Sequence, residues 1–274
     1  MWLDSMSRFA RSHKPTVVQY MSDLHLERID YQWSINPAAS ILLLAGDIGR
    51  FNDFDRYRAF IMQCCDHFTK VLLVGGNHEY YGTSHEEGLQ LVEDITNDPA
   101  TKGKVLYLHR TTYDVPNSNI TIAGCTLHSH IGEDRPSLTN DFRRIEGWTV
   151  DKHNLEHATD LAWLKSQLAL VGEKRRIIIA THYAPTLKKT CHPMHKGSKL
   201  NQCFASNAFD ELQSSPGARN VTHWVYGHTH WNTKFRRGKT LLISNQRCND
   251  FGKLNWWQRK FLYRPFNMNA VIEV

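Results

Sequence analysis

The chain has 274 residues, of which 41% are hydrophobic and 22% charged, and its formal net charge is +6. This length and apolar content can fill one large α/β core, so we expect a single domain over residues 16–274 behind an N-terminal arm of residues 1–15. No apolar run approaches the roughly 20 residues that cross a bilayer. The six cysteines include no CxxC pair, which argues against a disulfide framework. The composition favours a cytoplasmic protein with an anionic partner.

Two short segments allow a second interpretation. The first fourteen residues contain Ser and Arg, as mitochondrial presequences do, but Asp4 and the short length favour a simple arm. Cys191, His192 and His195 are metal-ligating residue types, although ordinary loop residues explain the same pattern. Neither segment defines a site by itself.

Short aliphatic and β-branched runs alternate with helical patterns along the chain, which is typical of a layered α/β fold. In chain order, strands are expected at 16–21, 41–45, 70–74, 104–108, 120–127, 176–180 and 221–226, and helices at 55–68, 84–97, 153–170 and 206–212. After His230, residues 233–237 and 240–244 flank Gly238 as a hairpin, and 270–274 forms a last strand. Antiparallel strands at this end favour two packed sheets over one parallel sheet.

Two long irregular stretches, 128–150 and 183–205, each follow a predicted strand. Loops of this size inside a compact domain are commonly functional. We therefore expect both to face a substrate, with disordered insertions as the alternative interpretation.

Polar residues follow the predicted strands at the positions where ligands collect in α/β sheets. Asp23 and His25 come directly after the strand 16–21, and in an extended segment their side chains project from the same side. Asp47 follows Gly46 after the buried strand 41–45, where a carboxylate serves either as a ligand or as a helix N-cap.

The same placement recurs further along the chain. Asn77 and His78 follow the strand 70–74, where Asn77 offers a neutral oxygen ligand and His78 can give a proton to a leaving oxygen. His182 follows the strand 176–180, and His228 and His230 follow the strand 221–226. Each residue alone has an ordinary explanation as a turn, surface or core residue, but five such strand ends in one chain together predict a metal site.

The order of these motifs, D-x-H, G-D, G-N-H-E, T-H and G-H-T-H, resembles the calcineurin-like metallophosphoesterases over roughly residues 16–245. The resemblance implies an α/β four-layer sandwich of two mixed β-sheets flanked by helices. It also implies two metal ions that share Asp47, with His78 beside the substrate and not a ligand. One ion would be held by Asp23, His25, Asp47 and His230, and the other by Asp47, Asn77, His182 and His228.

The resemblance extends to residues 140–145, which suggests Asp141 and Arg143 as substrate contacts. One motif departs from the protein serine/threonine phosphatases: the sequence after Asp47 lacks the second Asp that is expected to orient His78. The sequence leaves open whether Asp53, Asp55 or another carboxylate takes its place, and the departure weakens the case for a protein phosphatase.

The expected function is hydrolysis of a phosphate ester by a water that the two metal ions activate, with His78 as acid or leaving-group stabiliser. Imidazole and oxygen ligands suit divalent or trivalent Mn, Fe, Zn or Ni, and monoesters and diesters remain open as substrates. One alternative is a non-catalytic interaction module on the same fold. Another is a nucleic-acid phosphodiesterase, because Trp256 and Trp257 lie near Arg259 and Lys260, although such a segment more often packs on the core as a strand or arm.

Overall fold

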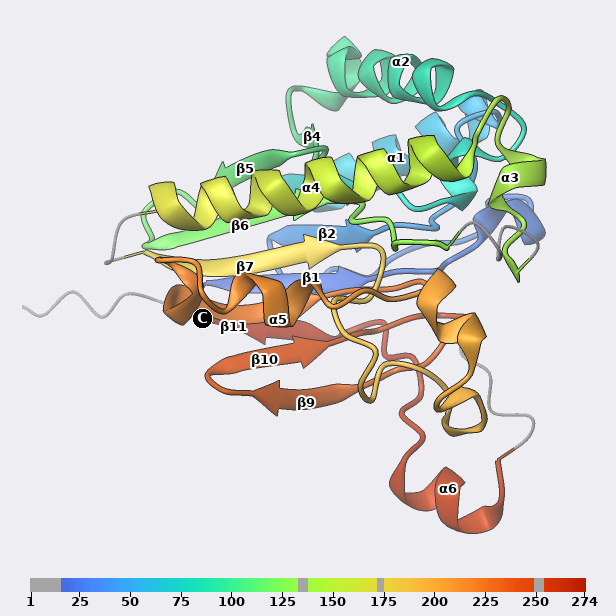
Figure 1. The fold of residues 1–274 in the computed structure, drawn as a ribbon. Coiled ribbons are helices and arrows are strands. Elements are labelled where there is room, and N and C mark those ends of the chain that lie inside the picture. Colours follow the sequence, from blue (N-terminus) through green and yellow to red (C-terminus); the bar gives the residue numbers. More distant parts are fainter. Residues whose placement is uncertain (1–15, 133–137, 172–174, 249–253) are drawn as a thin grey trace, which may run out of the picture.

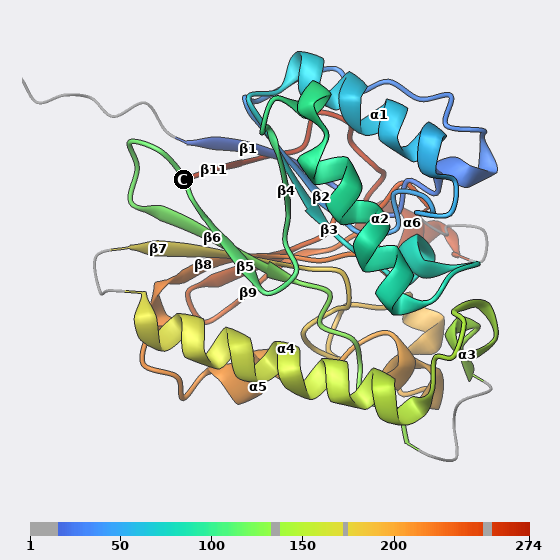
Figure 2. The same ribbon diagram turned by 90° about the horizontal axis from the view of Figure 1, so that it is seen from above.

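The computed structural model describes residues 16–132, 138–171, 175–248 and 254–274. Within these residues, a five-stranded sheet and a six-stranded sheet pack face to face, and helices cover both outer faces (Figures 1 and 2). The expected four-layer sandwich of two mixed sheets is confirmed. The expected arm of residues 1–15 lies outside the described residues.

The first sheet has the strand order β11-β1-β2-β3-β4. Its members are β1 (Val17–Met21), β2 (Ile41–Ala45), β3 (Lys70–Val74), β4 (Val105–Tyr107) and β11 (Val271–Glu273). Strands β1 to β4 are parallel and β11 is antiparallel to β1. Every residue of β2 is buried, as expected for a strand with layers on both faces.

The second sheet has the order β5-β6-β7-β8-β10-β9. Its members are β5 (Thr111–Asp114), β6 (Ile120–Cys125), β7 (Arg176–Thr181), β8 (Val221–Val225), β9 (Lys234–Arg237) and β10 (Thr240–Ile243). Strands β6, β7, β8 and β10 run parallel, while the edge strands β5 and β9 are antiparallel to their neighbours. The expected hairpin around Gly238 is therefore present as β9 and β10.

Three clusters of buried apolar side chains hold the four layers together. One fills the space between the sheets, with Leu43 and Leu72 from the first sheet and Ile178 from the second. The other two lie beneath the helices: α1 (Phe54–His67) and α2 (His85–Asn97) cover the first sheet, and α4 (Val150–Leu170) and α5 (Ala208–Leu212) cover the second. The two sheets are thus fixed face to face, with their parallel strands ending at the same edge of the molecule (Figure 2).

Several local expectations were wrong. Strand β5 and helix α3 (Asp141–Arg144) were not predicted, and the stretch 183–205 contains the 3-10 helices Pro193–His195 and Lys199–Cys203. The segment with the paired tryptophans forms helix α6 (Trp256–Phe261), which stands away from the sheets (Figure 1). Among the described helices, none is both long enough and apolar enough to cross a membrane.

Candidate dinuclear metal centre

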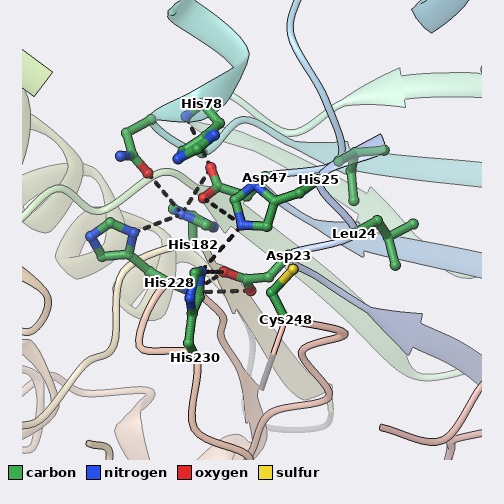
Figure 3. A network of polar contacts seen from close by, with 12 residues as sticks. Asp23, Leu24, His25, Asp47, His78, His182, His228, His230 and Cys248 are labelled. Atoms are coloured by element: carbon green, nitrogen blue, oxygen red, sulfur yellow. Dashed lines mark hydrogen bonds and ion pairs between the residues drawn. The ribbon is translucent and has the colours of Figure 1, made fainter. Parts of the chain in front are cut away.

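The predicted ligands meet at the carboxyl ends of five parallel strands. Strands β1, β2 and β3 lead into Asp23, Asp47 and Asn77, while β7 and β8 of the other sheet lead into His182 and His228. Because the two sheets end at the same edge, side chains from both point into one space (Figure 3). The site is therefore assembled across the interface between the sheets.

One group of side chains lies at the β1 side of this space. Ligand atoms of Asp23, His25, Asp47 and His230 all lie within 4.8 Å of one another. Nε2 of His25 is 3.2 Å from Nε2 of His230, and Nε2 of His230 is 3.4 Å from Oδ1 of Asp23. The four donor atoms are thus close enough to converge on a single ion.

A second group shares Asp47 with the first. Ligand atoms of Asp47, His182 and His228 lie within 4.8 Å of one another. Nε2 of His182 is 3.3 Å from Oδ1 of Asp47, 3.3 Å from Oδ1 of Asn77 and 3.1 Å from Nδ1 of His228. The structure therefore brings together all seven side chains that the resemblance implied, in the same two groups, with Asp47 in both.

The backbone at these residues differs from the extended form expected from the sequence. Asp23, His25, Asp47, His228 and His230 all have positive φ, between 47° and 67°. The reasoning that strand alternation places Asp23 and His25 on one side was therefore wrong, since a left-handed turn after each strand brings the side chains together. Non-glycine residues in this conformation cost free energy and are found where the surroundings hold them for a function.

Two glycines make room for the donor atoms. Gly46 has a φ of +87°, and a Cβ there would lie 2.3 Å from Nδ1 of His182. A Cβ on Gly76 would lie 2.3 Å from Oδ1 of Asp47 and 2.7 Å from its backbone nitrogen. Any side chain at either position would displace a predicted ligand, so the glycines are required by close approach.

The ionised carboxyl groups of the site favour the binding of cations. Burial opposes the ionisation of Asp47, but the neighbouring imidazoles outweigh it and hold the pKa of this carboxyl well below its ordinary value. Burial also opposes the protonation of His182, yet the carboxylates of Asp47 and Asp23 outweigh it and raise its pKa to about 10. Two buried carboxylates surrounded by imidazoles form a donor set of mixed oxygen and nitrogen that suits Mn, Fe, Zn or Ni.

The carboxylate partner of His78 is Glu27. Nδ1 of His78 lies 3.1 Å from Oε1 of Glu27, and the same oxygen lies 3.3 Å from Nδ1 of His25. Burial alone would raise the pKa of Glu27, but the bonds to the two histidines outweigh it and hold the pKa at about 2. Glu27 is thus an ionised acceptor that orients both rings. The sequence signal that points to it is its position two residues after His25.

The two candidates that the sequence suggested for this partner lie elsewhere. Asp53 bonds Tyr31 and Arg56, and Asp55 is exposed in the first turn of α1. The contact with His78 that was expected from a second Asp after β2 is therefore made by Glu27, which follows β1.

Glu79 is a second residue that supports the site and that the sequence did not reveal. Its buried carboxylate accepts hydrogen bonds from the backbone N–H groups of Asp47 at 2.8 Å, Ile48 at 2.7 Å and Gly76 at 2.7 Å. One side chain thereby ties the turn after β2 to the turn after β3. The signal in the sequence was its position directly after His78, in the middle of a ligand motif.

Asp141 and Arg143 were expected to contact substrate. The Asp141 carboxylate is buried and accepts hydrogen bonds from Nδ2 of Asn77 at 2.8 Å and from the hydroxyl groups of Tyr81 at 2.7 Å and Tyr183 at 3.1 Å. Asp141 therefore orients Asn77 so that its oxygen faces His182. Arg143 bonds Asn140, the residue before α3, and neither Asp141 nor Arg143 lines the pocket over the metal site.

This pocket has a volume of about 350 Å³. Its walls come from both long stretches expected to face a substrate: Leu138 and Asn140 from the first, and Cys191 and Phe204 from the second. His78 and His230 form part of its floor. His192 and His195 also line it, but among the described residues they do not join Cys191 in a group that could hold a metal ion.

The fold and these two groups of candidate ligands are typical of a metallophosphoesterase. The family model for calcineurin-like phosphoesterases matches residues 19–232, and the chain belongs to this family. Members of the family typically use two metal ions. The chain is similar to Uncharacterized protein L509 of Acanthamoeba polyphaga mimivirus, with 26% identity over 84% of this chain and 90% of that protein.

Two solved structures share the fold. The phosphopantetheinyl hydrolase of Mycobacterium tuberculosis matches with a TM-score of 0.64 and 16% identity, over 95% of this chain and 96% of that one. A dimetal phosphatase from Danio rerio matches with a TM-score of 0.50 and 16% identity, over 85% of this chain and 88% of that one. At this level of identity the two structures show the common architecture alone.

Proposed function

We propose that this chain hydrolyses a phosphate ester in a reaction that depends on two bound metal ions. The observation that carries the proposal is the pair of candidate ligand groups that share Asp47, next to a pocket that Asp47 and His78 both line. Asp23, His25, Asp47 and His230 would hold one ion, and Asp47, Asn77, His182 and His228 the other. Mn, Fe, Zn and Ni all suit these donors, so the choice of metal is left to experiment.

The electrostatics favour an anionic substrate. Two bound divalent ions would lower the pKa of a water molecule and stabilise the charge on phosphoryl oxygens. With roughly four positive charges from such ions and two negative charges from Asp23 and Asp47, the site would carry a net charge of about +2. A phosphate group carrying one or two negative charges complements this charge.

The residues of the chain supply the remaining parts of the reaction. Nδ1 of His78 faces Glu27, so Nε2 is the ring nitrogen that can act on a substrate in the pocket. Burial opposes protonation of His78, but the charges of Asp47 and Glu27 outweigh it and raise the pKa of the ring, which favours its protonated form. A protonated imidazole at this place can stabilise or protonate the leaving oxygen of the ester.

The proposal is tested by measuring metal content and turnover together. The protein is loaded with Mn²⁺, Fe²⁺, Zn²⁺ or Ni²⁺ and assayed on phosphomonoesters, phosphodiesters, cyclic nucleotides and phosphopeptides. His78→Ala should reduce turnover while metal content stays nearly unchanged, because the proposal places His78 beside the substrate and outside both ligand groups. A metal-loaded protein that hydrolyses none of these substrates would support the non-catalytic interaction module.

A nucleic-acid phosphodiesterase is the second candidate, and helix α6 favours it. Trp256 is 71% exposed and Trp257 55% exposed, with Arg259 and Lys260 in the same helix, so the expectation that the indoles pack on the core was wrong. Exposed aromatic rings beside cations can stack on unpaired bases. Binding of single-stranded DNA that weakens steeply with salt, and is lost in Trp256→Ala, would support this function.

The location in the cytoplasm stays a prediction from the sequence, which leaves the substrate open between phosphomonoesters and phosphodiesters.

A further inference from the structure

A second cavity lies beside the pocket over the metal site. Its volume is about 980 Å³, against about 350 Å³ for the metal-site pocket. Segment 187–202, the residues that lead into β9 and the residues after α6 form its walls. Cys191 and Asn201 line both cavities, and Nδ2 of Asn201 donates to Sγ of Cys191 at 3.0 Å. This pair of side chains thus marks the boundary between the cavities.

A residue that lines the second cavity is also next to a predicted ligand in the sequence. Trp231 lines it and directly follows His230, one of the predicted ligands. The Trp231 ring packs edge-on against His192 of the metal-site pocket, with ring centroids 4.9 Å apart. The second cavity therefore adjoins the metal-site pocket.

The charged side chains that line the second cavity are all basic. Lys188, Lys189, Lys196, Lys234 and Arg264 line it, and no acidic side chain is among its described lining residues. Lysines grouped around a concave surface raise the local concentration of anions. The cavity therefore complements a ligand with negative charge.

The remaining surface of the cavity is largely apolar. Trp231 is buried at one wall, Phe235 lies under the Lys189 ammonium group, and Phe261 and Leu262 remain exposed at the end of α6. Apolar walls with a few charged groups are typical of sites for organic molecules, and a volume of this size suits one. A phosphate ion alone would leave these apolar walls without contacts.

We propose that this cavity binds the part of the substrate that lies beyond the scissile phosphate, and that this part carries an apolar ring and at least one further phosphate, as a nucleotide does. The inference rests on the proposed function, because it takes the scissile phosphate to lie at the metal centre. The lysines bind the additional phosphate and the apolar walls bind the ring. Small aryl phosphates reach the metal site without using this cavity.

The inference is tested by binding of adenosine 5′-diphosphate, followed with a fluorescent N-methylanthraniloyl derivative on the full chain loaded with Mn²⁺. Lys196→Glu and Lys234→Glu reverse one charge each at the cavity, and neither residue belongs to the metal site. Exposed charges contribute modestly, so each variant should weaken binding by about threefold to tenfold at low salt. Lys239→Glu, in the turn between β9 and β10, makes the same charge change away from the cavity and should leave binding unchanged.

Competition identifies which part of the ligand each cavity holds. Inorganic phosphate should displace the probe in all variants with the same inhibition constant, since it needs only the metal site. Pyrophosphate should compete more weakly than ADP, since it lacks the ring. Equal binding in the two cavity variants and the wild type would overturn the inference, and so would equal competition by pyrophosphate and ADP. Charge-dependent ADP binding by a protein that hydrolyses no ester would refute the proposed function and leave the cavity site standing.

Discussion

Replacement of Glu27 tests how His78 is held beside the metal site. One oxygen of the buried carboxylate lies 3.1 Å from Nδ1 of His78 and 3.3 Å from Nδ1 of His25. A hydrogen bond to a charged group contributes about 1.5–3 kcal/mol, and 1.36 kcal/mol corresponds to about tenfold in rate. If the bond to His78 serves only to orient the ring for reaction, Glu27→Ala should lower kcat by about tenfold to 150-fold.

Glu27→Gln separates orientation from charge. The amide oxygen can still accept from one imidazole, so this variant should retain more activity than Glu27→Ala. Both variants also weaken the support of His25, and loss of such a supporting group typically lowers metal affinity about tenfold to 100-fold. The assay is therefore kcat on p-nitrophenyl phosphate at saturating Mn²⁺, divided by the metal content measured by mass spectrometry on the same sample.

Asp53→Ala is the matched control, because the sequence suggested Asp53 for the same role and the structure places it beside Tyr31 and Arg56. Its kcat per metal should stay within about twofold of the wild type, as for most surface substitutions. The reasoning is refuted if Glu27→Ala retains the full kcat per metal, or if Asp53→Ala loses as much activity as Glu27→Ala does.

Three further predictions concern the metal centre. Asp47→Asn should lose both metal ions and nearly all hydrolysis, because Asp47 belongs to both ligand groups. A metal analysis that finds two ions per chain in this variant would contradict the bridging role. Gly76→Ala should likewise lower metal content at least tenfold with little change in the circular dichroism spectrum, since the added Cβ would lie 2.3 Å from Oδ1 of Asp47. In the metal-free protein the pKa of His182 is raised to about 10, which favours the charged imidazolium form. A metal ion that binds this ring must therefore displace a proton. Metal affinity should then rise by about tenfold per pH unit for each proton displaced between pH 6 and 9, measured by titration with a competing chelator, and an affinity independent of pH would exclude a protonated ligand.

The sequence by itself determined the class of site. A ligand motif is local: an apolar run forms a buried strand, and the polar residue after it must lie at the end of that strand. Asp47 after β2 and His182 after β7 could therefore be placed without knowing how the two sheets meet. The order of the five motifs added the grouping of the ligands around Asp47, through the resemblance to a family.

The tertiary structure decided which groups support those ligands. Glu27 and His78 are 51 positions apart, and Asn77 and Asp141 are 64 apart, so no local pattern pairs them. Their contacts depend on how closely the loops pack, which is set by the burial of all their neighbours together. The left-handed backbone at Asp23 and His25 has the same origin, because only the surrounding structure can hold non-glycine residues there.

The same reason applies to the second cavity. Its lysines come from the segment that follows β7 and from β9, and they surround one space only because the sheet brings these parts of the chain together. The periodic pattern of apolar residues indicates which residues are buried, and polar residues directly after predicted strands indicate where ligands can gather. Contacts between distant loops leave no periodic pattern in the sequence, so the partner of His78 and the grouping of the lysines around the second cavity could be found only from the folded chain.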